Sequence, residues 1–135
     1  MTNTGNILAA LGLSALAGGM LFFGAVMAPL VFTKLPPEYA GPFIRAAFPR
    51  YYAFIIATSA LGCFGFLLRG QTLPAIALVI VALVTVWLWA WMIPHLNALR
   101  EAGNTVDFNR GHRLSVWING VELIIALWLL IRTAV

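Results

Sequence analysis

The chain has 135 residues, of which 62% are hydrophobic and only 9% are charged, and its mean hydropathy is +0.96. A soluble domain of this length cannot cover so much apolar surface, so the composition excludes an ordinary soluble protein and indicates an integral membrane protein. Eight Lys and Arg residues against four Asp and Glu give a net charge of +4. Most of these cations flank apolar runs, where they orient helices in a bilayer, so we expect no nucleic-acid partner.

Four apolar runs are long enough to cross a bilayer as helices, which takes about 20 residues each. In chain order they cover approximately residues 6–27, 51–68, 74–93 and 114–131. We therefore predict an all-α fold, an integral membrane four-helix bundle, in which residues 1–135 form a single transmembrane domain. The lipid bilayer is its expected partner.

The first run carries glycines on one face. Gly5, Gly12 and Gly19 recur every seven residues, and small residues let two helices approach closely in lipid. This face predicts a tight contact between helices. A helix of the same chain is the simpler partner, and a second copy of the chain, which would make a homo-oligomer, is the alternative.

The connections after the first and third runs are long and basic. They hold six of the eight Lys and Arg residues, at positions 34, 45, 50, 100, 110 and 113. Because basic loops stay on the cytoplasmic side, we expect long loops in the cytoplasm and both termini outside. Aromatic residues expected to anchor the helix ends at the membrane surface are Tyr51, Tyr52, Trp91, Trp117 and Trp128.

The pattern M-x-P followed by F-x-R occurs twice with the same spacing. Residues 27, 29, 43 and 45 recur 65 positions later as residues 92, 94, 108 and 110. The repeat suggests two duplicated helical hairpins, related by a pseudo-twofold axis along the membrane normal. The second hairpin has His95, His112 and Glu122 where the first has apolar residues.

Local signals also predict where helices begin and end. We expect the third helix to continue past Pro94 and to stop at Gly103, and Asp107 to be the N-cap of the fourth helix. Residues 37–47 are expected to form a short helix at the membrane surface.

Glu122 is a carboxylate in the middle of the last apolar run. An acidic residue at a helix centre costs roughly 2.5–3.5 kcal/mol on insertion scales, so such residues usually face a protein interior and mark a function. Because a helix turns by about 100° per residue, Glu122 lies on the same side of the helix as Asn119, Ser115 and His112. The last helix therefore has a polar stripe, formed by these four residues.

Hydroxyl groups of two other helices are expected at the depth of Glu122. The candidate ligand-binding residues are accordingly Glu122, Asn119, Ser115, His112, Thr58, Ser59 and Thr85. One interpretation is a structural hydrogen bond between helices, and the other is a proton-coupled or cation-binding site.

His95 and His112 lie on consecutive helices at the same membrane face and are the candidate metal ligands. Two imidazoles on facing helices can ligate haem iron or a transition metal. The alternative is a pair of interfacial histidines that hydrogen-bond loop carbonyls or lipid headgroups.

The chain resembles bacterial members of the domain-of-unknown-function family typified by human transmembrane protein 205. The resemblance rests on four segments, GGMLFFGAVMAPLVF, AAFPRYYAF, IPHLNAL and FNRGHRLSVWINGVEL. The most specific part of the resemblance is the pattern F-x-x-x-H-x-x-S-x-x-x-N, which is formed here by Phe108, His112, Ser115 and Asn119. The resemblance implies a four-helix membrane protein without an established activity, and its bacterial members imply a location in a bacterial inner membrane. More distantly, the first span is similar to the copper-resistance-D and membrane protoporphyrinogen oxidase families. Those have a histidine about where this chain has Ala9, which argues against haem or copper.

Three functional hypotheses follow from these observations. The first is a membrane protein that binds or moves a hydrophobic or cationic small molecule at the polar stripe. The second is a membrane oxidoreductase with a haem or metal at His95 and His112. The third is an accessory or scaffold subunit, in which the polar residues only hold helices together.

Overall fold

The computed structural model describes residues 2–134, and these form helices almost throughout, with no strand among them. The elements are α1 (Thr2–Leu21), η1 (Phe22–Met27), α2 (Ala28–Lys34), α3 (Pro37–Leu68), α4 (Thr72–Trp87), η2 (Leu88–Met92), α5 (Ile93–Glu101) and α6 (Thr105–Ala134). They join into four continuous rods, each long and apolar enough to cross a membrane. The predicted all-α, four-helix membrane fold is confirmed.

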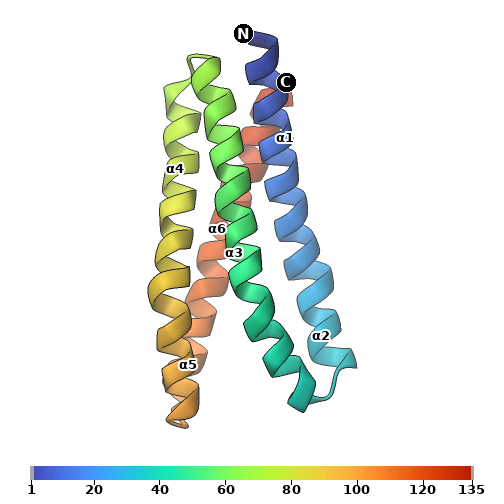
Figure 1. The fold of residues 1–135 in the computed structure, drawn as a ribbon, viewed down its shortest axis with the longest axis vertical. Helices are drawn as coiled ribbons and strands as arrows, with labels where there is room; N and C mark the ends of the chain where they lie inside the picture. Colours follow the sequence, from blue (N-terminus) through green and yellow to red (C-terminus); the bar gives the residue numbers. More distant parts are fainter. Residues whose placement is uncertain (1, 135) are drawn as a thin grey trace.

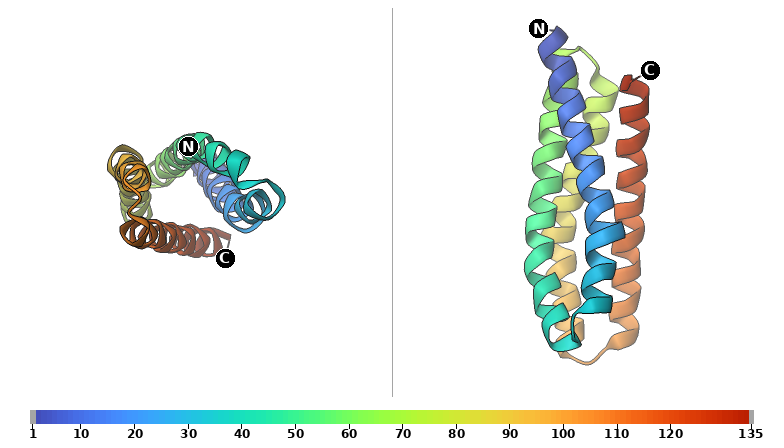
Figure 2. Two further views of the ribbon diagram at one scale, coloured as in Figure 1. Left: turned by 90° about the horizontal axis from the view of Figure 1, so that it is seen from below. Right: turned by 90° about the vertical axis from the view of Figure 1, so that its right-hand side faces the viewer.

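The rods form two antiparallel hairpins that stand side by side (Figure 1). The first hairpin consists of α1, η1 and α2 with α3, and the second of α4, η2 and α5 with α6. The α3–α4 turn and both chain ends lie at one end of the bundle, which we call the terminus end. The α2–α3 and α5–α6 connections lie at the other, the connection end. Toward the connection end the two hairpins diverge (Figure 1), and the view from below in Figure 2 shows α2 and the start of α3 apart from α5.

Each rod contains its predicted apolar run and extends well beyond it toward the connection end. The expected long loops are helical, and residues 37–47 belong to α3 instead of forming a separate surface helix. The prediction that the third helix continues past Pro94 is confirmed, and Gly103 ends it with a positive φ of 74°. The prediction of Asp107 as N-cap is wrong. Asn104 caps α6, because its Oδ1 accepts the Asp107 backbone N–H at 3.2 Å.

Two π-helical segments, η1 and η2, interrupt the rods just before a proline. The Ala28 N–H bonds to the carbonyl of Phe23, and the Ile93 N–H bonds to that of Leu88, each five residues back. Proline lacks an N–H and clashes with a regular helical turn, so a wider turn before it relieves the conflict. The segments end at Met27 and Met92, which are paired by the 65-residue repeat. This correspondence supports duplication of a hairpin.

The glycine face of α1 packs against α3 within the chain. A Cβ on Gly12 would collide with the backbone of Gly62, and one on Gly65 would collide with the backbone of Ala9. These contacts require the absence of side chains, because the two backbones approach one another directly. The glycine face is therefore used for intramolecular packing.

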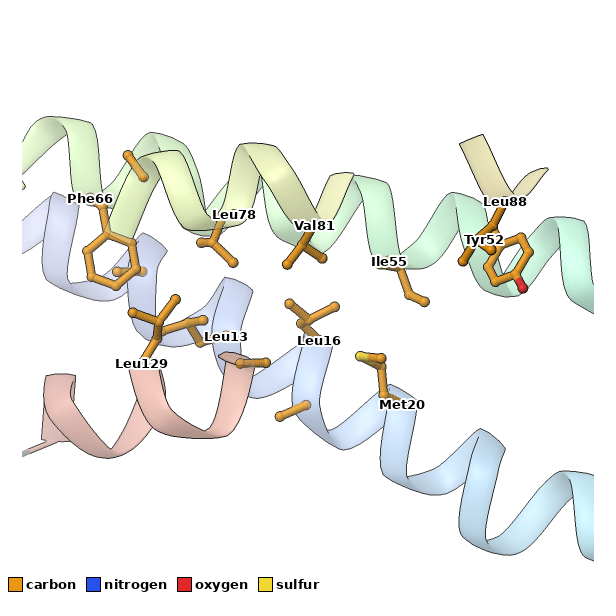
Figure 3. Close-up of a cluster of buried hydrophobic side chains, with 14 of the residues drawn as sticks. Leu13, Leu16, Met20, Tyr52, Ile55, Phe66, Leu78, Val81, Leu88 and Leu129 are labelled. Atoms are coloured by element: carbon orange, nitrogen blue, oxygen red, sulfur yellow. The ribbon is translucent and has the colours of Figure 1, made fainter. Parts of the chain in front are cut away.

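The apolar core lies between the four rods, mainly in the half nearer the terminus end (Figure 3). Its fully buried large side chains are Leu13, Leu16, Tyr52, Ile55, Phe66, Leu78, Val81 and Leu88. Tyr52 is only 2% exposed, so its predicted role as a membrane-surface anchor is wrong. Trp117 is 69% exposed, as an anchor requires, and large apolar residues cover most of the outer surface.

Candidate functional site

The polar stripe of α6 points toward the other helices for most of its length. Ser115 and Glu122 are buried, Asn119 is half-buried and His112 is exposed. Their spacing on a regular helix puts them on one side, as the sequence predicted. The stripe runs from the connection end to the middle of the bundle, and the polar groups that it meets differ along that path.

At the inner end of the stripe, Glu122 contacts Thr85 of α4. Thr85 Oγ1 lies 2.8 Å from Glu122 Oε2 and also 2.8 Å from the carbonyl oxygen of Val81. A hydroxyl has only one proton to donate. A neutral Glu122 carboxyl group satisfies both contacts, because it donates to Thr85 while Thr85 donates to Val81. The geometry thus accommodates a protonated acid at this depth.

The two hydroxyl residues expected from α3 differ in their surroundings. Thr58 Oγ1 donates within its own helix to the carbonyl of Phe54, at 2.8 Å. Ser59 is fully buried, and its Oγ has no hydrogen-bond partner among residues 2–134. Glu122 Oε1 also has no hydrogen-bond partner among residues 2–134. The structure therefore links Glu122 to Thr85 directly, and it records no direct bond from Glu122 to Thr58 or Ser59.

Nearer the connection end, the stripe forms hydrogen bonds along its own helix. Ser115 Oγ donates to the His112 carbonyl at 2.7 Å, and Asn119 Nδ2 donates to the Ser115 carbonyl at 2.9 Å. Asn119 Oδ1 is buried and has no partner within the described part of the chain. A buried polar atom normally has a partner, so this oxygen is a natural acceptor for a ligand's donor group.

Two cavities lie beside this part of the stripe, where the hairpins diverge. The first has a volume of about 220 Å³ and is lined by His112 and Ser115 of α6 together with Tyr52 of α3. The second has about 270 Å³ and is lined by His112 and Asn119. Both are bordered by His112 and by Phe48, so we call them together the cleft. Ligand pockets in proteins commonly hold about 300–1,000 Å³, and each of these cavities is somewhat smaller than that.

The walls of the cleft are largely apolar, and its charged groups are cations. Arg45 and Arg100 line the first cavity, and no carboxylate is among the described residues that line either one. Arg100 is held over the ring of Phe108, 4.7 Å from its centroid, and the Phe108 ring is parallel to that of His112 at 6.2 Å. This stack fixes one cation at the mouth of the cleft. The arrangement suits an apolar molecule with a neutral or acidic head group.

The two candidate metal ligands have different surroundings. His112 lines both cavities, whereas His95 stacks on Trp91 with a centroid distance of 4.6 Å and lines neither. Among the residues that the structure describes, no three His, Cys, Asp or Glu side chains are grouped as a metal site would require. The structure therefore does not bring the predicted pair together in one cavity.

Sequence reasoning missed three residues of the cleft. Arg45 and Arg100 were assigned only to membrane topology, and Tyr52 only to the membrane surface. A signal for Arg45 was present, because it belongs to the internal repeat. No sequence signal identified Tyr52, since its burial depends on how the two hairpins pack.

These features define a small four-helix membrane protein with a cleft between its two hairpins. The chain belongs to the family described as domain of unknown function (DUF4149), whose model matches residues 11–105. This match begins within α1, covers the second and third rods, and stops where α6 begins, so it does not include the polar stripe. No curated protein and no solved structure matches the chain.

Proposed function

We propose that this protein binds a small, mostly apolar molecule with an acidic or hydrogen-bonding head group in the cleft. The observation that carries the proposal is that His112 lines two cavities beside the polar stripe. The apolar part of the ligand lies along the second cavity, whose walls include Phe23 and Leu123. Its head group lies in the first cavity near Arg45 and Arg100.

The proposal favours a neutral or anionic ligand over the cationic one that Glu122 alone suggested. Arg45 and Arg100 would repel a cation, and they can form charge-assisted hydrogen bonds with an acid. Glu122 lines neither cavity. We assign Glu122 and Thr85 a positioning role, in which their bond joins α6 to α4 at the inner end of the cleft. Thr58 and Ser59 belong to the same supporting region.

The resemblance to the family of transmembrane protein 205 is part of this proposal. Its most specific segment comprises Phe108, His112, Ser115 and Asn119, and each of these residues lines one or both cavities. A shared pattern at the walls of a cleft is what a common ligand class would produce. We further propose an inner-membrane location with the connection end in the cytoplasm, supported by the six basic residues there.

Photolabelling with two matched probes tests the proposal. One probe is a long-chain fatty acid with a diazirine in its chain, and the other is the corresponding fatty alcohol. Gly120 lines the second cavity, and a Cβ placed there meets nothing within 4 Å. Gly120→Leu should therefore fill the cavity without disturbing the fold and should reduce labelling by at least tenfold.

Gly18→Leu is the matched control. Gly18 also has open space around its Cβ position, and it lines neither cavity of the cleft. We expect it to label like the wild type. Equal labelling of both variants would reject the cleft as the binding site and favour an accessory or scaffold role.

The oxidoreductase alternative predicts a different result. A haem would give the purified protein a Soret absorption band, and a metal would be present stoichiometrically and lost in His112→Ala. Either finding would support a bound cofactor and reject the proposed apolar ligand. Uptake of the fatty-acid probe into proteoliposomes would show whether binding leads to movement across the membrane.

A further inference from the structure

A third cavity, of about 350 Å³, lies at the terminus end of the bundle, away from the cleft. It is bounded by the α3–α4 turn and by the last turns of α6. Its polar lining consists of Arg69, Gln71, Arg132 and Thr133, and its apolar walls include Trp128. The first hairpin thus contributes one arginine and the second hairpin the other.

Within residues 2–134, both arginines are held by aromatic rings and not by acids. The guanidinium of Arg69 lies over the ring of Phe66, 5.7 Å from its centroid, and that of Arg132 lies 5.1 Å from Trp128. The one ion pair among residues 2–134 joins Arg110 to its neighbour Asp107 at the opposite end. Two cations that face one cavity repel one another, so an anion between them is favourable.

Arg69 also has an unused donor. Its Nη1 is buried and has no hydrogen-bond partner within the described chain. Leaving a buried charged donor without a partner is unfavourable. An acceptor in the cavity would remove that cost.

The backbone at this cavity is also suited to an anion. α4 begins at Thr72 without a side-chain cap, and its first turn contributes Leu73 and Pro74 to the cavity lining. The free N–H groups of a helix N-terminus favour negative charge, and because Pro74 has no N–H, those of this turn are the N–H groups of Thr72 and Leu73. At the end of α3, the carbonyl of Phe66 accepts the Gln71 N–H at 2.9 Å and that of Leu67 accepts the Gly70 N–H at 3.0 Å, so these two carbonyls are already occupied.

We propose that this cavity binds a phosphate group, as carried by the headgroup of an anionic phospholipid. Guanidinium groups match the planar, bidentate geometry of phosphate oxygens. The cavity lies where the rods end, at the level expected for lipid headgroups. Leu73, 80% exposed, and Trp128 flank it and offer an apolar surface to the acyl chains. This site is independent of the proposed ligand of the cleft.

Native mass spectrometry of the full chain in detergent tests this assignment. Purified protein is mixed with phosphatidylglycerol, and in separate samples with phosphatidylcholine or inorganic phosphate. The double variant Arg69→Gln, Arg132→Gln removes both guanidinium groups. The matched control, Arg110→Gln with Arg113→Gln, removes the same charge from exposed positions at the connection end. Circular dichroism confirms that each variant is folded.

We expect bound phosphatidylglycerol to decrease at least tenfold in the Arg69, Arg132 variant and to remain unchanged in the control. Arg132→Gln alone, at an exposed position near the end of α6, should show a partial decrease even if the double variant does not fold. Equal retention by all variants, or an equal loss in the control, would overturn the proposal. Retention of inorganic phosphate in place of the lipid would support the anion site and reject phospholipid as its source.

Discussion

Thr85 and Glu122 join the two long helices of the second hairpin through a buried contact of 2.8 Å between Oγ1 and Oε2. Glu122 is only 3% exposed and Thr85 is fully buried. The same Thr85 hydroxyl lies 2.8 Å from the Val81 carbonyl within α4. Thr85 therefore retains a hydrogen bond even when Glu122 is replaced, which limits how much stability the pair can contribute.

The coupling between Thr85 and Glu122 should accordingly be small. We expect a double-mutant cycle with Thr85→Val and Glu122→Gln to give an interaction energy of about 0.6 kcal/mol and at most about 1.7 kcal/mol, as for other hydrogen bonds in membrane bundles. Reversible unfolding in mixed micelles measures it. A coupling of several kcal/mol would mean that the pair is a main determinant of the fold.

The protonation state of Glu122 gives a second prediction. If the carboxyl group donates to Thr85 while Thr85 donates to Val81, the acid is neutral in the folded protein. The infrared spectrum at neutral pH should then contain the carbonyl band of a protonated carboxylic acid. The band should disappear in Glu122→Gln and persist in Glu38→Gln, a control at an exposed position. Its absence from the wild type would show that Glu122 is ionised.

Helix packing in the first hairpin should depend on Gly12. Its Cβ would collide with the backbone of Gly62, which cannot move as a flexible side chain would. We expect Gly12→Ala to lower the free energy of unfolding by about 1–3 kcal/mol. Gly18→Ala, which adds the same methyl group in open space, should be neutral or stabilising by up to about 1 kcal/mol. Similar thermal denaturation curves for the two variants would contradict the close approach of α1 and α3.

The arginines of the cleft should discriminate between the two photolabelling probes. A charge-assisted hydrogen bond contributes about 1.5–3 kcal/mol, so losing it weakens binding by about tenfold or more. Arg45→Gln with Arg100→Gln should reduce labelling by the fatty acid by that factor and leave labelling by the alcohol within about twofold. Arg113→Gln, which lies outside the cleft lining, is the control. Equal losses for both probes would place the head group elsewhere.

The orientation of the chain can be measured with fusions to its carboxyl end. Six basic residues at the connection end predict that this end is cytoplasmic and that α6 ends outside. Alkaline phosphatase fused after Val135 should therefore be active in a bacterial host. An inactive phosphatase together with a fluorescent green fluorescent protein fusion would reverse the orientation.

Sequence reasoning predicted the four helices and the shared depth of Thr85 and Glu122, because hydropathy and helical periodicity are local properties. It predicted that the third helix continues to Gly103, but not that the first rod continues through α2 or that α3 begins as early as Pro37. Residues 37–47 were expected as a separate surface helix, yet they belong to α3, which contains both Pro42 and Pro49. The π-helical segments before Pro29 and Pro94 were also not predicted, since they depend on how each rod accommodates its proline.

The cleft was harder to predict than the stripe that borders it. His112, Ser115 and Asn119 follow from helical spacing, whereas the approach of Arg45 and Tyr52 depends on the angle between the two hairpins. The spacing of residues along a single helix does not determine the angle between two hairpins. For the same reason, the sequence placed His95 near His112, although in the structure His95 stacks on Trp91 and lines neither cavity of the cleft.

Mapping the residues that carry the photolabel tests the central proposal most directly. After irradiation of the wild type with the diazirine fatty acid in lipid nanodiscs, mass spectrometry of the digested protein locates the adducts. Binding in the cleft predicts adducts on its lining residues, such as Phe23, Asn119 and Leu123, and their loss in Gly120→Leu. Adducts spread over outward-facing residues such as Leu83 and Ile124, and unchanged by Gly120→Leu, would contradict it.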